Sequence, residues 1–596
     1  MKVPTRSAGG FRFRASLAVY ILAIASVART EELPVSIQID TNAQRGMFGP
    51  VASPSAFAGW SSRQSQVAFL NDTDSMGMVR LNVEEAMTES TSLDDYKARL
   101  DALGQGWNMI EAKGGTIVIT MARMPRWLSS KRFSLFSSRL ADPAVPSGFR
   151  TYEASPPYKY NLWSQLVQAT VERFSVELNL HPIYEVWNEP DLRAFWLGTT
   201  DDYLKLYRYA VLGARRADPS ARLGGPATSG LEVRIEEDRT QSLLEEFIAY
   251  CAVTPLPELN YPRLPIDLVV WHHYSSNPTL GWADATDFVR QVLVANGFPE
   301  TTPLAVDEWN YWADSEWSEP ERDTEFGAAY VAAAIGAMTR AGVAYQSVAA
   351  LEDFSDDASS PFHGDFGLMT YGSLLRKPSY LSVLALGKLE GGTELGTEVA
   401  SPDFLTSAPT LEVLSSQQPN GDIVIVVWNF IPTLEGIVTL SMTGKGYDID
   451  YLAQVVADSG SDVETLVNRA IMDPDFIAGL PYPASVQADL QEAVDDAVQG
   501  DVLRATSLRA SVTVTGDPSA QYLMERYAID SHRSNSYRAY EAAVSQGLTQ
   551  AEAIEEARTH SALEQVEAYG PVSGDGLFPF EIEPFSVHLI VLEALD

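Results

Sequence analysis

The chain has 596 residues, enough for roughly one to three domains, and its 45% hydrophobic and 10% aromatic residues exclude a mainly disordered protein. With 42 basic and 79 acidic residues the formal net charge is −37, which disfavours nucleic acids and anionic membrane surfaces as partners and weighs against polyanionic substrates. The single cysteine, Cys251, excludes an intrachain disulfide bond and a cysteine-based zinc site.

The N-terminal segment has the organisation of a secretory signal peptide. The apolar run Ala15–Val27 ends in the small-x-small pattern Ser26-Val27-Ala28 and is preceded by the basic residues Lys2, Arg6, Arg12 and Arg14. The run is too short to span a membrane. We therefore expect removal of residues 1–28 and a secreted protein, either extracellular or periplasmic.

Residues 45–395 alternate between short β-branched runs and stretches with helical periodicity, which predicts a (β/α)8 barrel, an α/β fold. An eighth strand is expected near Arg45–Val51. A doubly wound sheet is the rival, but the Gly-rich phosphate loop typical of that fold is not found, since Gly224-Gly225-Pro226 reads as a strand end followed by a turn. The other seven expected strands are Gly77–Val83, Thr116–Met121, Ile183–Trp187, Arg222–Gly225, Asp267–His272, Leu304–Glu308 and Ala344–Ala350.

Residues 396–596 change to strands separated by turns, which predicts an accessory β-sandwich domain. Two helical insertions are expected in it, at about 451–503 and 537–566. The strand-like Val35–Asp40, within residues 29–44, is expected to join this domain from the N-terminal side. The expected strands are Leu411–Leu414, Asp422–Trp428, Ile437–Met442, Ala510–Thr515 and Val587–Leu592.

Two apolar strands of the predicted barrel end in glutamates. The first ends in Asn188-Glu189-Pro190, where the proline stops the strand, and the second leads into Asp307-Glu308. In a barrel both side chains would lie at the carboxyl ends of the strands, where catalysis occurs. Two carboxylates facing one mouth are what glycoside hydrolysis requires, one as proton donor and one as nucleophile.

Each glutamate also has a structural interpretation, because a lone glutamate at a strand end is usually a salt-bridged surface group. Trp187 and Trp309 next to the two glutamates favour the catalytic interpretation, since aromatic rings stack on the C–H faces of sugars. His272-His273 invites a metal site, but no third ligand lies at a suitable spacing, so neither a metal nor a cofactor is expected. His273 is expected to face the barrel wall.

The sequence resembles glycoside hydrolase family 39, a retaining family of β-xylosidases and α-L-iduronidases, over most of the mature chain. Six segments carry the resemblance, in the family's order. They are Glu185–Trp196, Tyr203–Tyr207 with Leu223–Ala227, Asp267–Tyr274, Phe362–Leu368, Arg376–Tyr380 and, near the C-terminus, Ile529–Tyr540.

The resemblance implies a role for individual residues. Glu189 would be the general acid/base, with a raised pKa, and Glu308 the nucleophile that forms a glycosyl-enzyme intermediate. Asn188 would hydrogen-bond the sugar 2-hydroxyl. Further residues implied to line the sugar site or hold the nucleophile are His272, Tyr274, Arg80, Asn310 and Trp127, and for Trp127 a packing role is an equal alternative.

The chain departs from the xylosidase pattern at sugar-reading positions. Asn82 stands where xylosidases carry histidine, Glu352 stands where they carry tryptophan, and small residues around Ser359 and Ser360 replace an acidic pair. We expect Glu352 to accept hydrogen bonds from sugar hydroxyls and to repel uronates. The expected substrate is an oligo- or polysaccharide with a neutral β-linked xylosyl, galactosyl or glucosyl unit. Alternatives are an endo-acting polysaccharide hydrolase or transglycosylase, and a non-catalytic carbohydrate-binding protein.

Overall fold

The computed structural model describes residues 33–133, 140, 148–231, 242–313, 318–355, 359–400, 410–447, 449–459, 462–517, 519–573 and 578–595. The expected signal peptide lies outside these residues. In the described part, no helix is both long and apolar enough to cross a membrane.

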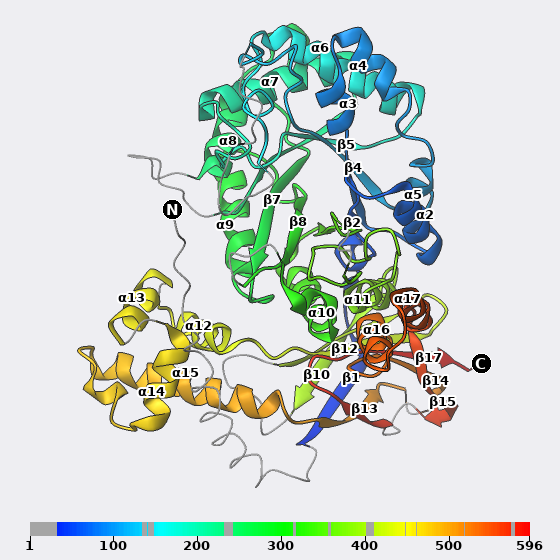
Figure 1. Cartoon of the computed structure of the whole chain (residues 1–596), viewed down its shortest axis with the longest axis vertical. Helices are drawn as coiled ribbons and strands as arrows, with labels where there is room; N and C mark the ends of the chain where they lie inside the picture. Colours follow the sequence, from blue (N-terminus) through cyan, green and yellow to red (C-terminus); the bar gives the residue numbers. More distant parts are fainter. Residues whose placement is uncertain are drawn as a thin grey trace.

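Eight parallel strands form a closed barrel, which confirms the predicted (β/α)8 fold and excludes the doubly wound sheet (Figure 1). Each strand pairs with its sequence neighbours, and β2 closes the barrel by pairing with β9. The strands are β2 (Ala56–Phe57), β3 (Met78–Asn82), β4 (Thr116–Met121), β5 (Ile183–Val186), β6 (Arg222–Thr228), β7 (Leu268–Ser275), β8 (Leu304–Tyr311) and β9 (Tyr345–Ala349).

Helices cover the outside of the barrel because each presents an apolar stripe to the outward-facing strand residues. In α7 a capping box between Thr199 and Asp202 fixes the N-terminus. The covering helices are α2 (Arg63–Asp72), α3 (Glu84–Glu89), α4 (Leu93–Leu100), α5 (Asn108–Ala112), α6 (Tyr160–Val171), α7 (Thr200–Ala217), α8 (Leu243–Val253), α9 (Trp282–Ala295), α10 (Glu325–Ala341) and α11 (Pro378–Gly387).

The accessory domain contains a mixed sheet in which nine strands are hydrogen-bonded side by side in the order β15-β14-β17-β12-β11-β10-β1-β13-β16. Alternate residues of these strands form their own apolar core, separate from that of the barrel. The strands are β1 (Leu33–Met47), β10 (Thr393–Ala400), β11 (Leu411–Gln417), β12 (Ile423–Asn429), β13 (Leu508–Thr515), β14 (Gln521–Ile529), β15 (Glu564–Ser573), β16 (Phe578–Ile582) and β17 (Val587–Ala594).

The first barrel strand differs from the prediction. Residues 45–47 of the expected strand Arg45–Val51 belong to β1, which pairs with β10 and β13, and Pro50–Ala52 forms a 3-10 turn. The barrel begins instead at β2, which has only two residues. Pro50 lacks a backbone N–H and fixes its own φ, which explains why the extended chain ends before it. A two-residue strand carries no detectable periodicity.

One expected strand of the accessory domain, Ile437–Met442, is wrong. These residues lie in α12 (Leu434–Gly444), where the Thr433 side chain caps the first turn by accepting from the Gly436 N–H. Ile437, Val438 and Met442 are buried in a separate helical cluster, so this short apolar run faces helices and not a sheet. The other helices of the cluster are α13 (Ile449–Ser459), α14 (Val463–Met472) and α15 (Ala484–Leu503).

The two domains are joined by the segment before α16 (Ser536–Ser545), which is followed by α17 (Gln550–Thr559). Arg538 Nη2 lies 2.5 Å from Glu325 Oε1 at the first residue of α10, and Asn535 Nδ2 donates to Glu325 Oε2 at 3.0 Å. Ser536 Oγ donates to the Arg376 carbonyl. The family-like Ile529–Tyr540 segment therefore holds the accessory domain against the barrel.

Candidate active site

A polar layer crosses the interior of the barrel above an apolar one. The apolar interior cluster includes Met78, Val118, Ile183, Val270 and Ala305. Since side chains alternate along a strand, the residues two positions later face the same interior. These residues are all polar and buried, and they are Arg80, Thr120, Glu185, His272 and Asp307.

A bulge in β8 brings two neighbouring carboxylates into this interior. The pairing register between β8 and β9 shifts between Val306 and Trp309, both of which face the surrounding helices. Asp307 and Glu308 between them therefore both face the barrel interior, which regular alternation would forbid. A second irregularity, between Trp271 and His273 of β7, lies beside it.

Glu189 is held just beyond β5 in a sparsely populated backbone conformation. Its φ is 45°, and that of Trp187 is 78°, both in the left-handed region. Its N–H donates to the Ala227 carbonyl at 2.8 Å, and the Trp187 indole is buried against neighbouring rings. Non-glycine residues in this region cost of order 1–3 kcal/mol each and cluster at functional sites.

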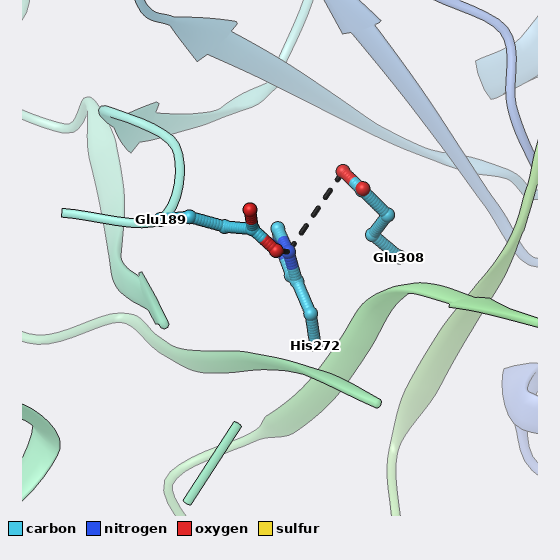
Figure 2. Close-up of side chains that lie close together, drawn as sticks. All are labelled: Glu189, His272 and Glu308. Atoms are coloured by element: carbon cyan, nitrogen blue, oxygen red, sulfur yellow. Dashed lines mark hydrogen bonds and ion pairs between the residues drawn. The ribbon is translucent and has the colours of Figure 1, made fainter. Parts of the chain in front are cut away.

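The two predicted glutamates face each other across His272 (Figure 2). His272 Nδ1 lies 2.9 Å from Glu189 Oε1 and 3.8 Å from Glu308 Oε2. One oxygen of Glu189, one nitrogen of His272 and one oxygen of Glu308 all lie within 4.8 Å of one another. The strand-end glutamates are thus brought together, as the sequence predicts.

Glu308 receives two hydrogen bonds, one on each carboxylate oxygen. Arg80 Nη1 donates to Oε2 at 2.5 Å and Tyr274 Oη donates to Oε1 at 3.0 Å. Arg80 Nη2 also donates to Asn188 Oδ1 and to Glu185 Oε1, each at 2.7 Å. Arg80 is 1% exposed, so this one guanidinium fixes the positions of three acceptors in a dry environment.

The buried carboxyl groups of the site have pKa values that are shifted in different directions. Burial raises the pKa of Glu189 above its ordinary value, by more than the hydrogen bond from His272 lowers it. Burial likewise raises the pKa of Glu185 to about 8, although Arg80 opposes this. For Asp307, Arg80 and His272 outweigh burial and lower the pKa to about 2. Glu189 is therefore favoured as a proton carrier.

Sequence reasoning did not assign roles to Glu185 and Asp307, which complete the charge balance around Arg80. Glu185 accepts from Arg80 and from Thr120 Oγ1, and Asp307 lies 3.2 Å from Arg80 Nε and 3.4 Å from His272 Nε2. The sequence contained a signal for both residues. Each is a carboxylate at a strand position that faces the barrel interior, where the preceding interior residue is apolar.

Two predicted sugar-binding residues are occupied elsewhere. The Glu352 carboxylate accepts from the Ser62 N–H, Ser65 Oγ and the Gly372 N–H, so it caps the N-terminus of α2. These contacts favour a structural role for Glu352 over the expected role of binding sugar hydroxyls and repelling uronates. Asn310 Nδ2 donates to the carbonyl oxygens of Ala349 and Phe366, at 2.5 and 3.0 Å.

The remaining predicted residues lie around the mouth. Trp127 is partly buried and donates its indole N–H to Ser90 Oγ, in agreement with the packing alternative. Asn82 lies at the end of β3, two residues after Arg80, and its Nδ2 is buried without a hydrogen-bond partner in the described part of the chain. The His273 ring packs against Trp282 of α9, and burial lowers its pKa to about 4.

Glu189, His272 and Glu308 also have the spacing of a three-ligand metal site, a juxtaposition that sequence spacing did not reveal. These atoms already serve other partners. Glu308 Oε2 accepts from the Arg80 guanidinium, and Glu308 Oε1 accepts from Tyr274. Burial lowers the pKa of His272, but Glu308, Asp307 and Glu189 together raise it well above its ordinary value, which favours an imidazolium that cannot coordinate a metal ion.

A (β/α)8 barrel places catalytic residues at the carboxyl ends of its strands, and two facing carboxylates there are the arrangement that glycoside hydrolysis requires. Comparison with protein families agrees with this class, since residues 132–437, just over half of the chain, match the model of glycosyl hydrolases family 39. The chain belongs to glycosyl hydrolase family 39. Glycosidases of this family are retaining O-glycosyl hydrolases.

Two curated relatives are named β-xylosidase. The protein from Caldicellulosiruptor saccharolyticus is 29% identical over 311 residues, which is 50% of this chain and 60% of that protein. The protein from Geobacillus stearothermophilus is 26% identical over 319 residues, covering 48% of this chain and 56% of that protein. The matched region thus spans little more than half the length of these relatives.

Solved structures share the fold over nearly the whole chain. A monomeric β-xylosidase from Caulobacter crescentus superposes with a TM-score of 0.62 at 18% identity, covering 94% of this chain and 100% of that one. The family 39 enzyme from Xanthomonas axonopodis pv. citri gives 0.61 at 18% identity, covering 95% and 99%. At this identity the likeness establishes the barrel and its accessory domain.

Proposed function

We propose that this protein is a retaining glycosidase that works by double displacement, with Glu308 as nucleophile and Glu189 as general acid/base. The observation that carries the proposal is the separation of the two carboxylates, whose facing oxygens lie within 4.8 Å. Retaining glycosidases hold the two carboxyl groups about 5–5.5 Å apart, whereas inverting enzymes need about 6.5–9.5 Å to admit a water between them.

In the first step Glu308 attacks the anomeric carbon as the bond to the leaving oxygen breaks. Glu189 donates its proton to that oxygen, and a covalent glycosyl-Glu308 ester forms. The raised pKa of Glu189, caused by burial, supports a protonated starting state. Arg80 and Tyr274 donate to the two oxygens of Glu308 and hold its carboxylate in position.

In the second step water attacks the anomeric carbon of the ester and loses its proton to Glu189. Glu308 leaves as carboxylate, so the enzyme returns to its initial state and the sugar keeps its anomeric configuration. Asn188 is oriented by Arg80 at 2.7 Å, with its amide nitrogen available for the sugar 2-hydroxyl, as the family resemblance implies. Such a contact strengthens as the oxocarbenium-like transition state develops.

For the substrate we propose a neutral β-linked sugar. The names of the two β-xylosidase relatives make a xyloside the first candidate, and glucosides and galactosides follow because Asn82 departs from the xylosidase pattern. The net charge of −37 supports a neutral substrate over a polyanionic one. The expected export of the chain belongs to the same proposal, and N-terminal sequencing of protein from the culture medium, with Arg29 as the expected first residue, tests it.

The test combines a substrate panel with two substitutions. Aryl β-xyloside, β-glucoside, β-galactoside and α-arabinoside are assayed with the wild type, Glu189→Gln and Glu308→Gln. We expect hydrolysis of at least one substrate, loss of about 10³-fold or more in kcat for each variant, and covalent labelling by a 2-deoxy-2-fluoro glycoside that Glu308→Gln abolishes. Near-wild-type turnover by either variant contradicts the assignment, and failure of the whole panel favours a polysaccharide-specific enzyme or the carbohydrate-binding alternative.

A further inference from the structure

A cavity of about 630 Å³ adjoins the barrel mouth outside the catalytic centre. Its lining includes Trp60, Asn82, Glu84 and Arg123, which lie at or just after the carboxyl ends of β2, β3 and β4, and also residues 102–105 and Trp107. We call it the Trp60 cavity. Its size is within the range of about 300–1,000 Å³ that is typical of small-ligand sites.

Trp60 is held in the cavity wall with part of its ring free. Its indole N–H donates to Glu84 Oε2 at 3.1 Å, and its ring packs against Phe57 and Phe354, with centroids 4.7 and 5.4 Å away. Nevertheless 43% of Trp60 is exposed. A tryptophan fixed by a hydrogen bond and two rings but open to solvent on the cavity side is a preformed platform for an apolar sugar face.

The charged groups in the same wall cancel each other. Arg123 Nε lies 2.8 Å from Glu84 Oε2, and both side chains are largely buried, at 18% and 8% exposed. Among the described residues, no acceptor takes a hydrogen bond from the two Nη atoms of Arg123, so their N–H groups can donate to a ligand. The backbone of Arg123 has a φ of 66°, in the left-handed region, where a non-glycine residue is held against its own preference. A neutral wall with donors and an aromatic face suits hydroxyl-bearing ligands.

The cavity is connected to the nucleophile by a short series of contacts. Arg80, which donates to Glu308, lies over the Phe57 ring at 4.8 Å, and that ring contacts Trp60. Trp60 follows β2, which in the closed barrel is two strands from β8, which carries Glu308, and three from β5, which precedes Glu189. Because the leaving group must lie on the side of the proton donor, a sugar unit stacked on Trp60, on the side of the nucleophile, belongs to the other side of the scissile bond.

We infer that the Trp60 cavity binds a second neutral sugar unit on the glycone side of the scissile bond, so that the preferred substrate is an oligosaccharide from which a disaccharide is released. This inference rests on the proposed glycosidase activity. It adds to that activity the number of sugar units that the enzyme prefers and the residues that contact the second unit.

Matched aryl substrates test the inference. Initial rates of nitrophenol release are compared for 4-nitrophenyl β-xyloside and β-xylobioside, and for the corresponding β-glucoside and β-cellobioside, and the sugar product is identified. We expect kcat/KM at least about tenfold higher on the bioside of the accepted sugar, which corresponds to about 1.4 kcal/mol. The expected first product is the intact disaccharide.

Variants connect this preference to the cavity. Trp60→Ala and Arg123→Gln should each lose at least about fivefold more kcat/KM on the bioside than on the monoside. Phe288→Ala, at a half-exposed aromatic residue on α9 outside the cavity, should leave both rates and their ratio unchanged. Residual monoside hydrolysis by each variant shows that it is folded, and the wild-type ratio is independent of any variant.

The outcomes separate the two proposals. If the monoside is hydrolysed but the wild type shows no bioside preference, or if the variants lose equal rates on both substrates, the cavity inference is overturned and the glycosidase proposal stands. If neither substrate of any pair is hydrolysed, both fall. Stepwise release of monosaccharide from the xylobioside, before nitrophenol appears, also overturns the cavity inference.

Discussion

Arg80 Nη1 lies 2.5 Å from Glu308 Oε2, joining β3 to β8, two barrel strands that do not pair with each other. The same guanidinium binds Glu185 and Asn188 of the β5 segment. One side chain thus sets the positions of the proposed nucleophile and of the residue next to the acid/base. Because all three acceptors are buried, the geometry depends on the planar fork of the guanidinium and not on its charge alone.

Arg80→Lys should therefore inactivate the enzyme although it keeps the charge. A lysine offers one point charge and cannot serve Glu308, Glu185 and Asn188 at once, so we expect kcat/KM to fall by about 10²-fold or more on the accepted aryl glycoside. Arg45→Lys is the control, since Arg45 forms an exposed ion pair with Glu394 in the accessory sheet. A change of less than about threefold for Arg80→Lys is inconsistent with this role.

The pH dependence should follow Glu189. Burial raises its pKa, and the first step requires its protonated form, so kcat/KM should be retained below this pKa and lost as the pH rises through it. We expect the alkaline limb of the profile to lie above the ordinary glutamate pKa. The variant Glu189→Gln is measured with an activated aryl glycoside whose leaving group needs no proton, so that it still turns over. Its profile should lack this alkaline limb. An alkaline limb that persists unchanged in the variant assigns it to another group.

Tyr274→Phe should lower kcat while preserving the fold. The variant keeps the ring contacts with Trp312 and Phe366 but removes the hydrogen bond to Glu308 Oε1. Loss of one donor to a buried charged group costs about 1.5–3 kcal/mol, or about 10- to 100-fold in rate. The rate of labelling by a 2-deoxy-2-fluoro glycoside measures this step directly. Tyr447→Phe, which removes a hydroxyl–carboxylate bond to Asp489 in the helical insertion, should leave that rate unchanged.

Glu352→Gln should affect stability and not specificity. The carboxylate accepts three hydrogen bonds at the start of α2, and an amide would place a donor against one of these N–H or O–H groups. We expect the free energy of unfolding to fall by about 1–3 kcal/mol, while kcat/KM ratios among aryl glycosides stay constant. The exposed Glu398→Gln serves as control. A changed preference between sugars would restore Glu352 to the substrate site.

The barrel and the two glutamates could be predicted because their signals are local. Each buried strand is a short apolar run, and Glu189 and Glu308 lie where such runs end. The interior polar layer was also within reach, since Arg80, Glu185 and Asp307 each stand two positions after an interior apolar residue. Counting positions along each strand would have placed Glu185 and Asp307 beside the proposed nucleophile.

The contacts of Glu352 and Asn310 and the helix at Ile437–Met442 have tertiary causes. Glu352 follows β9 as a catalytic residue would, but its partners Ser62 and Gly372 come from distant parts of the sequence. Asn310 lies on the correct strand, yet its amide satisfies backbone carbonyls beyond β9. Ile437–Met442 is apolar enough for a strand, and the surrounding helices determine its conformation. None of these partners can be read from local pattern.

The pairing of β1 has a consequence for how the chain is made. β1 precedes the barrel in sequence but lies between β10 and β13, so the barrel is enclosed between strands of the accessory sheet. During vectorial synthesis the barrel can close while β1 still waits for partners that emerge several hundred residues later. Cutting the gene at the barrel boundary would leave either the sheet without a central strand or β1 without both neighbours. The two domains are therefore one unit of biosynthesis, completed only when the C-terminal strands arrive.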